Sequence, residues 1–245
     1  DRIRFGASGV AGGTLTNAAG GTLNLSSTHA TPLENFNGGT VNNAGTLNQT
    51  ATGTHAVDSG ITFNNTGTVN IDAGTLSIGG GGTDTGVYAV DAGATLAFAG
   101  GTRNLNAGSN VTGLGTLTVS GATLNVNNLL GIGTTGAALN VSSGALNVNS
   151  TITAAPTLTF SGGTLGGSGA LTVTGAFNIT GNSTLAGSGT LTTQGTTTVS
   201  MGAVYLMATR WEMSNLVQNV ASMIGLAVGI DYSLLIVHRY REALR

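Results

Sequence analysis

Cysteine and lysine are absent from this 245-residue sequence, and proline and charged residues are scarce. Without cysteine the chain has neither disulfides nor thiolate metal sites. Only 7% of the residues are charged, against roughly 25% in ordinary globular domains, and no charged residue stands between Arg103 and Arg210. Nucleic-acid binding needs clustered cations that neutralise phosphates, so the composition excludes a nucleic-acid partner. Two prolines against 42 glycines also exclude collagen, which is rich in proline.

A short phrase, Gly-Thr-Leu followed by Asn, Thr or Ser, repeats along most of the chain. Its copies stand at residues 13–16, 21–24, 45–48, 74–77, 115–118 and 189–192. The phrase alternates small polar with apolar residues, which is the two-residue period of a strand, and Gly, Thr and Asn are poor helix formers. Doublets of the phrase recur every 20 to 29 residues, a period typical of stacked repeats. The pattern predicts an all-β, right-handed parallel β-solenoid (β-helix) of roughly eight coils within residues 1–200.

The same alternation predicts which side chains point inward and which outward. Small polar residues such as Thr14, Asn24, Asn42 and Thr68 are expected outside. The expected core is apolar and includes Leu15, Leu23, Val69, Val87, Leu96, Leu117, Leu185 and Leu191. A turn motif of Asn or Asp followed by Ala-Gly occurs at residues 43–45, 72–74, 91–93 and 106–108. These residues favour turns, so we expect them at one place per coil, where their side chains would stack into a polar ladder.

These Gly-Thr-Leu strand repeats resemble the passenger regions of bacterial autotransporters and related surface proteins. The resemblance covers residues from about 12 to 200. It implies a non-catalytic stalk, adhesin or coat in the cell envelope, with the solenoid extracellular or periplasmic. Surface glycans or ligands on host and other cells are the partners that it implies. It implies no cofactor.

Three groups of residues in the solenoid are candidates for chemistry. Asp58, Asp72, Asp84 and Asp91 lie close in sequence, and paired carboxylates serve glycoside hydrolysis, but two of them share the turn motif, which favours a structural role. Residues 79–84 match the start of a calcium-binding nonapeptide. Because the motif occurs once, a flexible turn is the favoured interpretation. His29 and His55 are spaced near one coil length, but a third ligand is missing. The sequence therefore predicts no metal site and no enzyme.

The composition changes at about residue 200. All four methionines and the single tryptophan follow that point, and residues 216–237 contain one charged residue, Asp231. Twenty-two such residues suffice to span the roughly 30 Å hydrocarbon core of a bilayer, so membrane lipid is the expected partner of residues 216–237. Arginines on the C-terminal side predict that this end is cytoplasmic. We expect a mostly helical second segment over residues 201–245.

Two features of this segment point further. Ala221, Gly225 and Gly229 form a small-xxx-small ridge that favours helix–helix self-association. The string MIGLAVGIDY at residues 223–232, continuing SLLIVHRYRE, resembles a transmembrane helix of the MMPL transporters, relatives of the RND exporters. The resemblance implies that Asp231 is a proton-relay acid and that Tyr232 is its hydrogen-bonding neighbour.

The sequence thus predicts a surface-exposed structural or adhesive solenoid with a membrane helix at its C-terminal side. One alternative is a fragment of, or fusion to, a proton-driven MMPL transporter. A second is a polysaccharide-acting β-helix enzyme. Because the sequence begins at Asp1, we also expect a fragment or processed product, and an artificial join of two coding segments is a further account of the change at residue 200.

Overall fold

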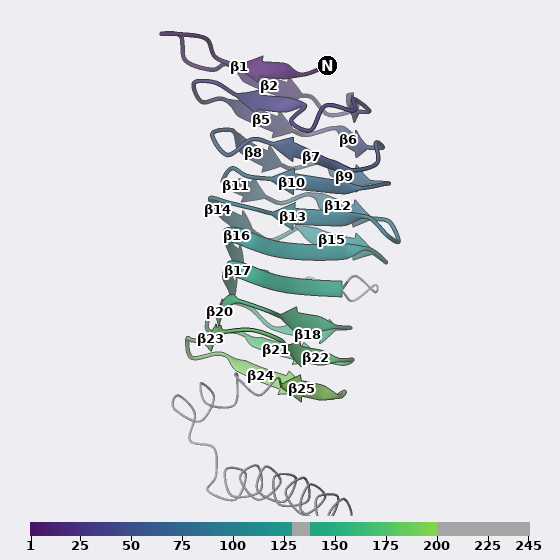
Figure 1. Cartoon of the computed structure of the whole chain (residues 1–245), viewed down its shortest axis with the longest axis vertical. Helices are drawn as coiled ribbons and strands as arrows, with labels where there is room; N and C mark the ends of the chain where they lie inside the picture. The colour runs from purple at the N-terminus through teal and green to yellow at the C-terminus, as the bar shows by residue number, and fades with distance from the viewer. Residues whose placement is uncertain (129–137, 200–245) are drawn as a thin grey trace, which may run out of the picture. The chain divides into compact units, whose positions relative to one another are not determined.

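The computed structural model describes residues 1–128 and 138–199. All strand pairings between neighbouring turns of this part are parallel, and the turns stack along the solenoid axis (Figure 1). Eight turns have a described strand on all three sides of the coil. The predicted all-β parallel solenoid of roughly eight coils is therefore confirmed. The predicted helix over residues 201–245 lies outside the described residues.

The strands form three ladders, which we call side 1, side 2 and side 3. Side 1 contains β1 (Ile3–Phe5), β4 (Leu33–Asn35), β7 (Thr54–Val57), β10 (Thr75–Ile78), β13 (Thr95–Phe98), β16 (Thr116–Val126), β17 (Ala138–Val148), β19 (Leu158–Phe160), β22 (Phe177–Ile179) and β25 (Thr197–Val199). Side 2 contains β2 (Thr14–Asn17), β5 (Thr40–Asn43), β8 (Thr62–Asn65), β11 (Gly82–Asp84), β14 (Thr102–Leu105), the second halves of β16 and β17, β20 (Gly163–Gly166) and β23 (Ser183–Leu185).

Side 3 is described in two parts. The first contains β3 (Thr22–Leu25), β6 (Thr46–Gln49), β9 (Thr68–Ile71), β12 (Val87–Val90) and β15 (Asn110–Gly113), and the second contains β18 (Ile152–Ala155), β21 (Ala170–Val173) and β24 (Thr190–Thr193). Sides 1 and 2 count as one 17-stranded sheet because the 11-residue strands β16 and β17 continue round the corner between them.

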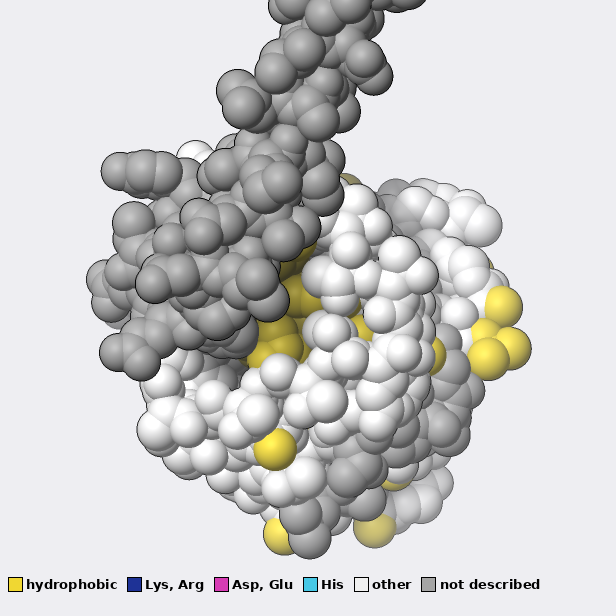
Figure 2. Space-filling model, turned by 90° about the horizontal axis from the view of Figure 1, so that it is seen from below, with side chains coloured by type: hydrophobic (Ala, Val, Ile, Leu, Met, Phe, Trp, Pro, Cys, Tyr) yellow, Lys and Arg dark blue, Asp and Glu magenta, His cyan; other side chains and the backbone are white. Residues whose placement is uncertain are grey.

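Strand register follows the repeated phrase. Thr75 lies opposite Thr95, which lies opposite Thr116, so equivalent residues stack directly on one another. The leucines that follow them, Leu76, Leu96 and Leu117, are fully buried. Because side chains alternate along a strand, each coil places one apolar row inside and one Thr, Ser or Asn row outside. Figure 2 shows apolar side chains enclosed by uncharged polar surface at the C-terminal end of the described part.

The predicted core is largely confirmed, with one error of register. Val87 was expected inside but is half-buried and outward, whereas its neighbour Tyr88 is fully buried. The strand β12 aligns Tyr88 with the buried Val69 of the turn above. The inward position in this strand is therefore Tyr88, one residue after the predicted Val87. Four other expected core residues are only half-buried, namely Leu15, Leu23, Leu185 and Leu191. They lie in the first and last described turns, where a described neighbouring turn covers them on one side only.

Candidate functional site

The predicted relay and packing residues cannot be placed. Asp231, Tyr232, Ala221, Gly225 and Gly229 lie outside the described residues, as does the lipid-contacting stretch 216–237. Within residues 1–128 and 138–199, no helix is both long and apolar enough to cross a bilayer. The candidate site in the described part is therefore a different one, built from the polar groups inside the solenoid.

The four aspartates do not form an acidic pair or cluster. Asp58 follows the side 1 strand β7, and its carboxylate accepts hydrogen bonds from the backbone N–H groups of Asn35 and Ser59. Asp72 and Asp91 are exposed and follow the side 3 strands β9 and β12. Asp84, by contrast, is fully buried on side 2. None of the four bonds to another within the described chain, so the structure does not bring the acids of the glycosidase alternative together.

The predicted equivalence of the four turn motifs is wrong. Asp72 and Asp91 stand at the corner after side 3, but Asn43 is the last residue of β5 and Asn106 follows β14, both on side 2. Asn43 is 1% exposed and belongs to the interior. The repeat length alone did not separate these corners, because motifs on two sides of one coil recur with similar spacing.

The expected single ladder of the four turn motifs is not present, but asparagines stack in several other columns. Inside side 2, Asn17 Nδ2 donates to Asn43 Oδ1 over 2.7 Å, and Asn43 Nδ2 donates to Asn65 Oδ1 over 2.8 Å. Outside, amide-to-amide bonds join four further sets of asparagines. Two sets lie on side 2 (Asn42 with Asn64, and Asn104 through Asn125 to Asn147), one lies on side 3 (Asn24 through Asn48 to Asn70), and one follows side 2 (Asn106 through Asn127 to Asn149). All of these bonds run from turn to turn, and those of the inner column satisfy buried amides, which would otherwise destabilise the fold.

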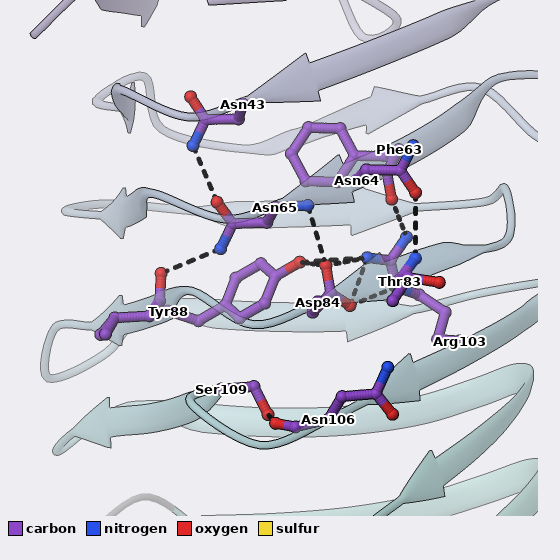
Figure 3. A network of polar contacts seen from close by, with 11 residues as sticks. Asn43, Phe63, Asn64, Asn65, Thr83, Asp84, Tyr88, Arg103, Asn106 and Ser109 are labelled. Carbon is purple, nitrogen blue, oxygen red and sulfur yellow. Dashed lines mark hydrogen bonds and ion pairs between the residues drawn. The ribbon is translucent and has the colours of Figure 1, made fainter. Parts of the chain in front are cut away.

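The inner asparagine column ends at a buried charge cluster, Asp84, Tyr88 and Arg103 (Figure 3). Asp84 occupies the position below Asn65 in the ladder and accepts from the backbone N–H of Asn65 over 3.2 Å. Tyr88 Oη donates to Asp84 over 2.8 Å. Arg103 donates to the same carboxylate through Nε at 3.1 Å and through Nη2. The carboxylate is thereby surrounded by donors, as a buried charge requires.

The guanidinium of Arg103 is also held by a backbone carbonyl and two aromatic rings, and a glycine leaves room for it. Arg103 Nη1 donates over 2.8 Å to the carbonyl oxygen of Phe63, two turns away on side 2. Its Cζ lies 5.2 Å from the ring centroid of Phe98 and 5.6 Å from that of Phe63, within cation–π range. Gly82 lies between Phe63 and Arg103, and a β-carbon there would be 1.8 Å from the Phe63 oxygen and 3.0 Å from Arg103 Nη1. Only glycine leaves room for this reach.

Burial and the neighbouring charges shift the pKa values of Asp84 and Arg103 in opposite directions. Burial raises the pKa of the Asp84 carboxyl, although Arg103 opposes the rise. Burial also opposes the charge on Arg103, but Tyr88 and Asp84 outweigh it and raise the pKa of the guanidinium above its ordinary value. Burial and then Asp84 raise the pKa of Tyr88 well above its ordinary value. Arg103 therefore stays charged, and its stability inside the core depends on Asp84.

The calcium and flexible-turn interpretations of residues 79–84 are both wrong at Asp84. This residue ends β11, and its carboxylate binds Arg103 rather than facing solvent. In the described part no three His, Asp or Glu residues gather as metal ligands. His29 and His55 share no hydrogen bond in the described part: His29 contacts Arg2 and accepts from the backbone N–H of Thr31, and His55 bonds to Gln49.

The sequence contains one feature from which the buried charge cluster could have been predicted. Arg103 stands in the phrase Thr-Arg-Asn-Leu at residues 102–105, and the next turn repeats it as Thr-Leu-Asn-Val at residues 123–126. An arginine in a leucine position inside a repeat predicts a buried cation, and a buried cation requires a nearby acid.

Comparisons with known proteins match the C-terminal part of the chain. The MMPL family matches residues 188–245, a stretch that begins just before β24. The "Mycolic acid-containing lipids exporter MmpL11" of Mycolicibacterium smegmatis is 53% identical over 47 residues, which are 19% of this chain and 5% of that protein. The "Heme uptake protein MmpL11" of Mycobacterium tuberculosis is 45% identical over 47 residues, again 19% of this chain and 5% of that protein.

These relatives are far longer than the matched stretch, since the chain spans 5% of their length. No solved structure matches the chain. The comparisons therefore show similarity to the MMPL family over residues 188–245.

Proposed function

We propose that the solenoid is a non-catalytic structural or adhesive module of the cell envelope and that residues 216–237 hold it in the membrane. The observation that carries the proposal is the surface of the described turns. Their outward rows are Thr, Ser and Asn in regular columns, and the buried charged pair, Asp84 and Arg103, is sealed inside with 0% side-chain exposure. Such a surface offers repeated neutral contacts to a glycan or another cell surface, and the buried ion pair serves the fold.

Location is tested by cysteine labelling, for which the absence of native cysteine gives a clean background. We expect a membrane-impermeant maleimide to label Thr62→Cys in intact cells that express the full chain, because Thr62 is on the exposed face of β8. Ala243→Cys, next to the C-terminal arginines, should be labelled only after permeabilisation. The reverse pattern, or labelling of both positions in intact cells, would contradict the proposed orientation.

A transporter component is the second candidate, and the match of residues 188–245 to the MMPL family favours it. The two candidates differ in the role of Asp231. In an anchor, Asp231→Leu removes a residue that costs about 2.5–3.5 kcal/mol at the centre of a membrane helix, so membrane insertion should improve and no flux should be lost. In a proton relay the same change abolishes proton movement.

The measurement is proton flux into vesicles reconstituted with the full chain, made in parallel with an insertion assay. We expect no flux above empty vesicles for either the wild type or Asp231→Leu. Asp231→Asn, which keeps the side-chain size and polarity, is the matched control. Flux that depends on Asp231 would favour the transporter candidate.

A further inference from the structure

A histidine and a glutamine lie side by side in the interior at the corner between β6 and β7. Gln49 ends β6 and is 0% exposed, and His55 in β7 is 2% exposed. Both occupy positions that are apolar in the next turn, where Ile71 lies opposite Gln49 and Leu76 lies opposite His55. Two polar side chains thus replace an apolar pair at this corner.

Hydrogen bonding fixes how the two side chains face each other. Gln49 Nε2 donates over 2.8 Å to the backbone carbonyl oxygen of Ala51. The same nitrogen lies 2.8 Å from His55 Nδ1. A carbonyl oxygen only accepts, so the NH₂ group of Gln49 must face Ala51, and His55 Nδ1 must then be the acceptor of its second hydrogen. The ring is neutral in this arrangement, with its proton on Nε2.

A protonated His55 fits neither orientation of the glutamine amide. With the amide as it stands, a proton on Nδ1 would meet the hydrogens of Gln49 Nε2. If the amide turned over, Oε1 could accept from the ring but would meet the carbonyl oxygen of Ala51. In the present orientation Gln49 Oε1 is buried without a partner in the described part of the chain, so a turned amide would leave its nitrogen there instead.

Within residues 1–128 and 138–199, no charged group forms an ion pair with the His55 ring. On β4, Glu34 accepts from Arg4 and lies next to Arg2. Asp58, after β7, accepts from backbone N–H groups, and Asp72, after β9, is exposed. His29, in the turn above, accepts from the backbone N–H of Thr31. The strands β6, β8, β9 and β10 carry no ionisable residue, and no ion pair to His55 exists in the described residues.

We propose that this corner is a pH-sensitive joint: when His55 takes up a proton, the corner between β6 and β7 opens while distant turns stay closed. Local opening is possible because the strands at this corner pair only with those of the neighbouring turns. Because the closed corner offers no acceptor for a proton on His55 Nδ1, acid should shift the corner toward its open form, by at most about tenfold for each pH unit.

Hydrogen exchange measured by mass spectrometry on the full chain tests the proposal. Exchange is compared at pH 7.5 and 5.5 after correction for the intrinsic pH dependence of the amides. We expect faster corrected exchange in residues 46–57, with residues 138–148 of β17 as the internal reference. Equal corrected changes in both segments would overturn the proposal without any variant.

Variants assign the effect to the pair. Gln49→Ile with His55→Leu restores the residues of the next turn, Ile71 and Leu76, and should abolish the acid-dependent exchange. His29→Gln should leave the effect intact, because His29 accepts from Thr31 and does not bond to Gln49. Loss of the effect in His29→Gln, or its persistence in the double variant, would show that His55 is not the group responsible.

Discussion

Replacing Arg103 with methionine is expected to reduce the free energy of unfolding by about 3–5 kcal/mol, because the carboxylate of Asp84 would stay buried without its partner. Asp84 has 0% side-chain exposure, so the backbone could not bring it to water without opening the turn. Stability of a whole domain is only about 5–15 kcal/mol. A single substitution would thus remove a large share of it, as measured by chemical denaturation of the full chain followed by circular dichroism.

The double variant Asp84→Asn with Arg103→Met should recover most of that loss. The introduced asparagine would extend the inner column of Asn17, Asn43 and Asn65, and it could still accept from Tyr88. Methionine is apolar and adapts to irregular spaces, such as the one beside Gly82. Replacement of a buried ion pair by well-packed residues is often neutral or stabilising by about 1–4 kcal/mol.

Comparison of the two variants separates charge from packing. Thr102→Ser, on the exposed outer row next to Arg103, is the control and should change stability very little. The single and double variants could instead lose the same stability. In that case the main stabilising contribution of Arg103 would come from its bond to Phe63 and its contacts with the rings of Phe63 and Phe98, and the unpaired carboxylate would not explain the loss.

The repeating phrase predicted the fold because its alternation of polar and apolar residues decides which side chains point inward, and its repetition favours parallel stacking of the strands. Once Thr75, Thr95 and Thr116 are equivalent, Leu76, Leu96 and Leu117 must all be inside, and parallel stacking is the arrangement that aligns them. The same alternation predicted that the outward rows are polar. Where asparagines stack in such a row, their side-chain amides hydrogen-bond to one another from turn to turn.

The errors arose where the alternation is ambiguous or broken. In β12, Val87 and Val90 are both apolar but lie on opposite faces, so hydrophobicity alone could not choose between Val87 and Tyr88; the pairing with Val69 decides it. Asp84 was placed in a turn because it follows four glycines. Its burial depends on Arg103, 19 residues later in sequence, and a contact between turns is not visible in a local pattern.

The last prediction concerns the apolar core in the middle of the solenoid. Leu117→Asp should unfold the turns around β16, because Leu117 is fully buried between Leu96 of β13 and Leu139 of β17. A charge placed there without a partner costs several kcal/mol or takes up a proton. Thr116→Ser, the neighbouring residue on the outer row, is the matched control and should be nearly silent.

The extent of unfolding distinguishes local from global coupling. Because β16 pairs only with strands of the neighbouring turns, hydrogen exchange should rise most in residues 95–98, 116–119 and 138–141, with less change in the first turns. The dependence of unfolding on denaturant should also become shallower, because less surface remains to be exposed. Uniform loss of protection along residues 1–128 would instead mean that the solenoid unfolds as one cooperative unit, and wild-type protection around β16 would contradict the assignment of Leu117 to the core.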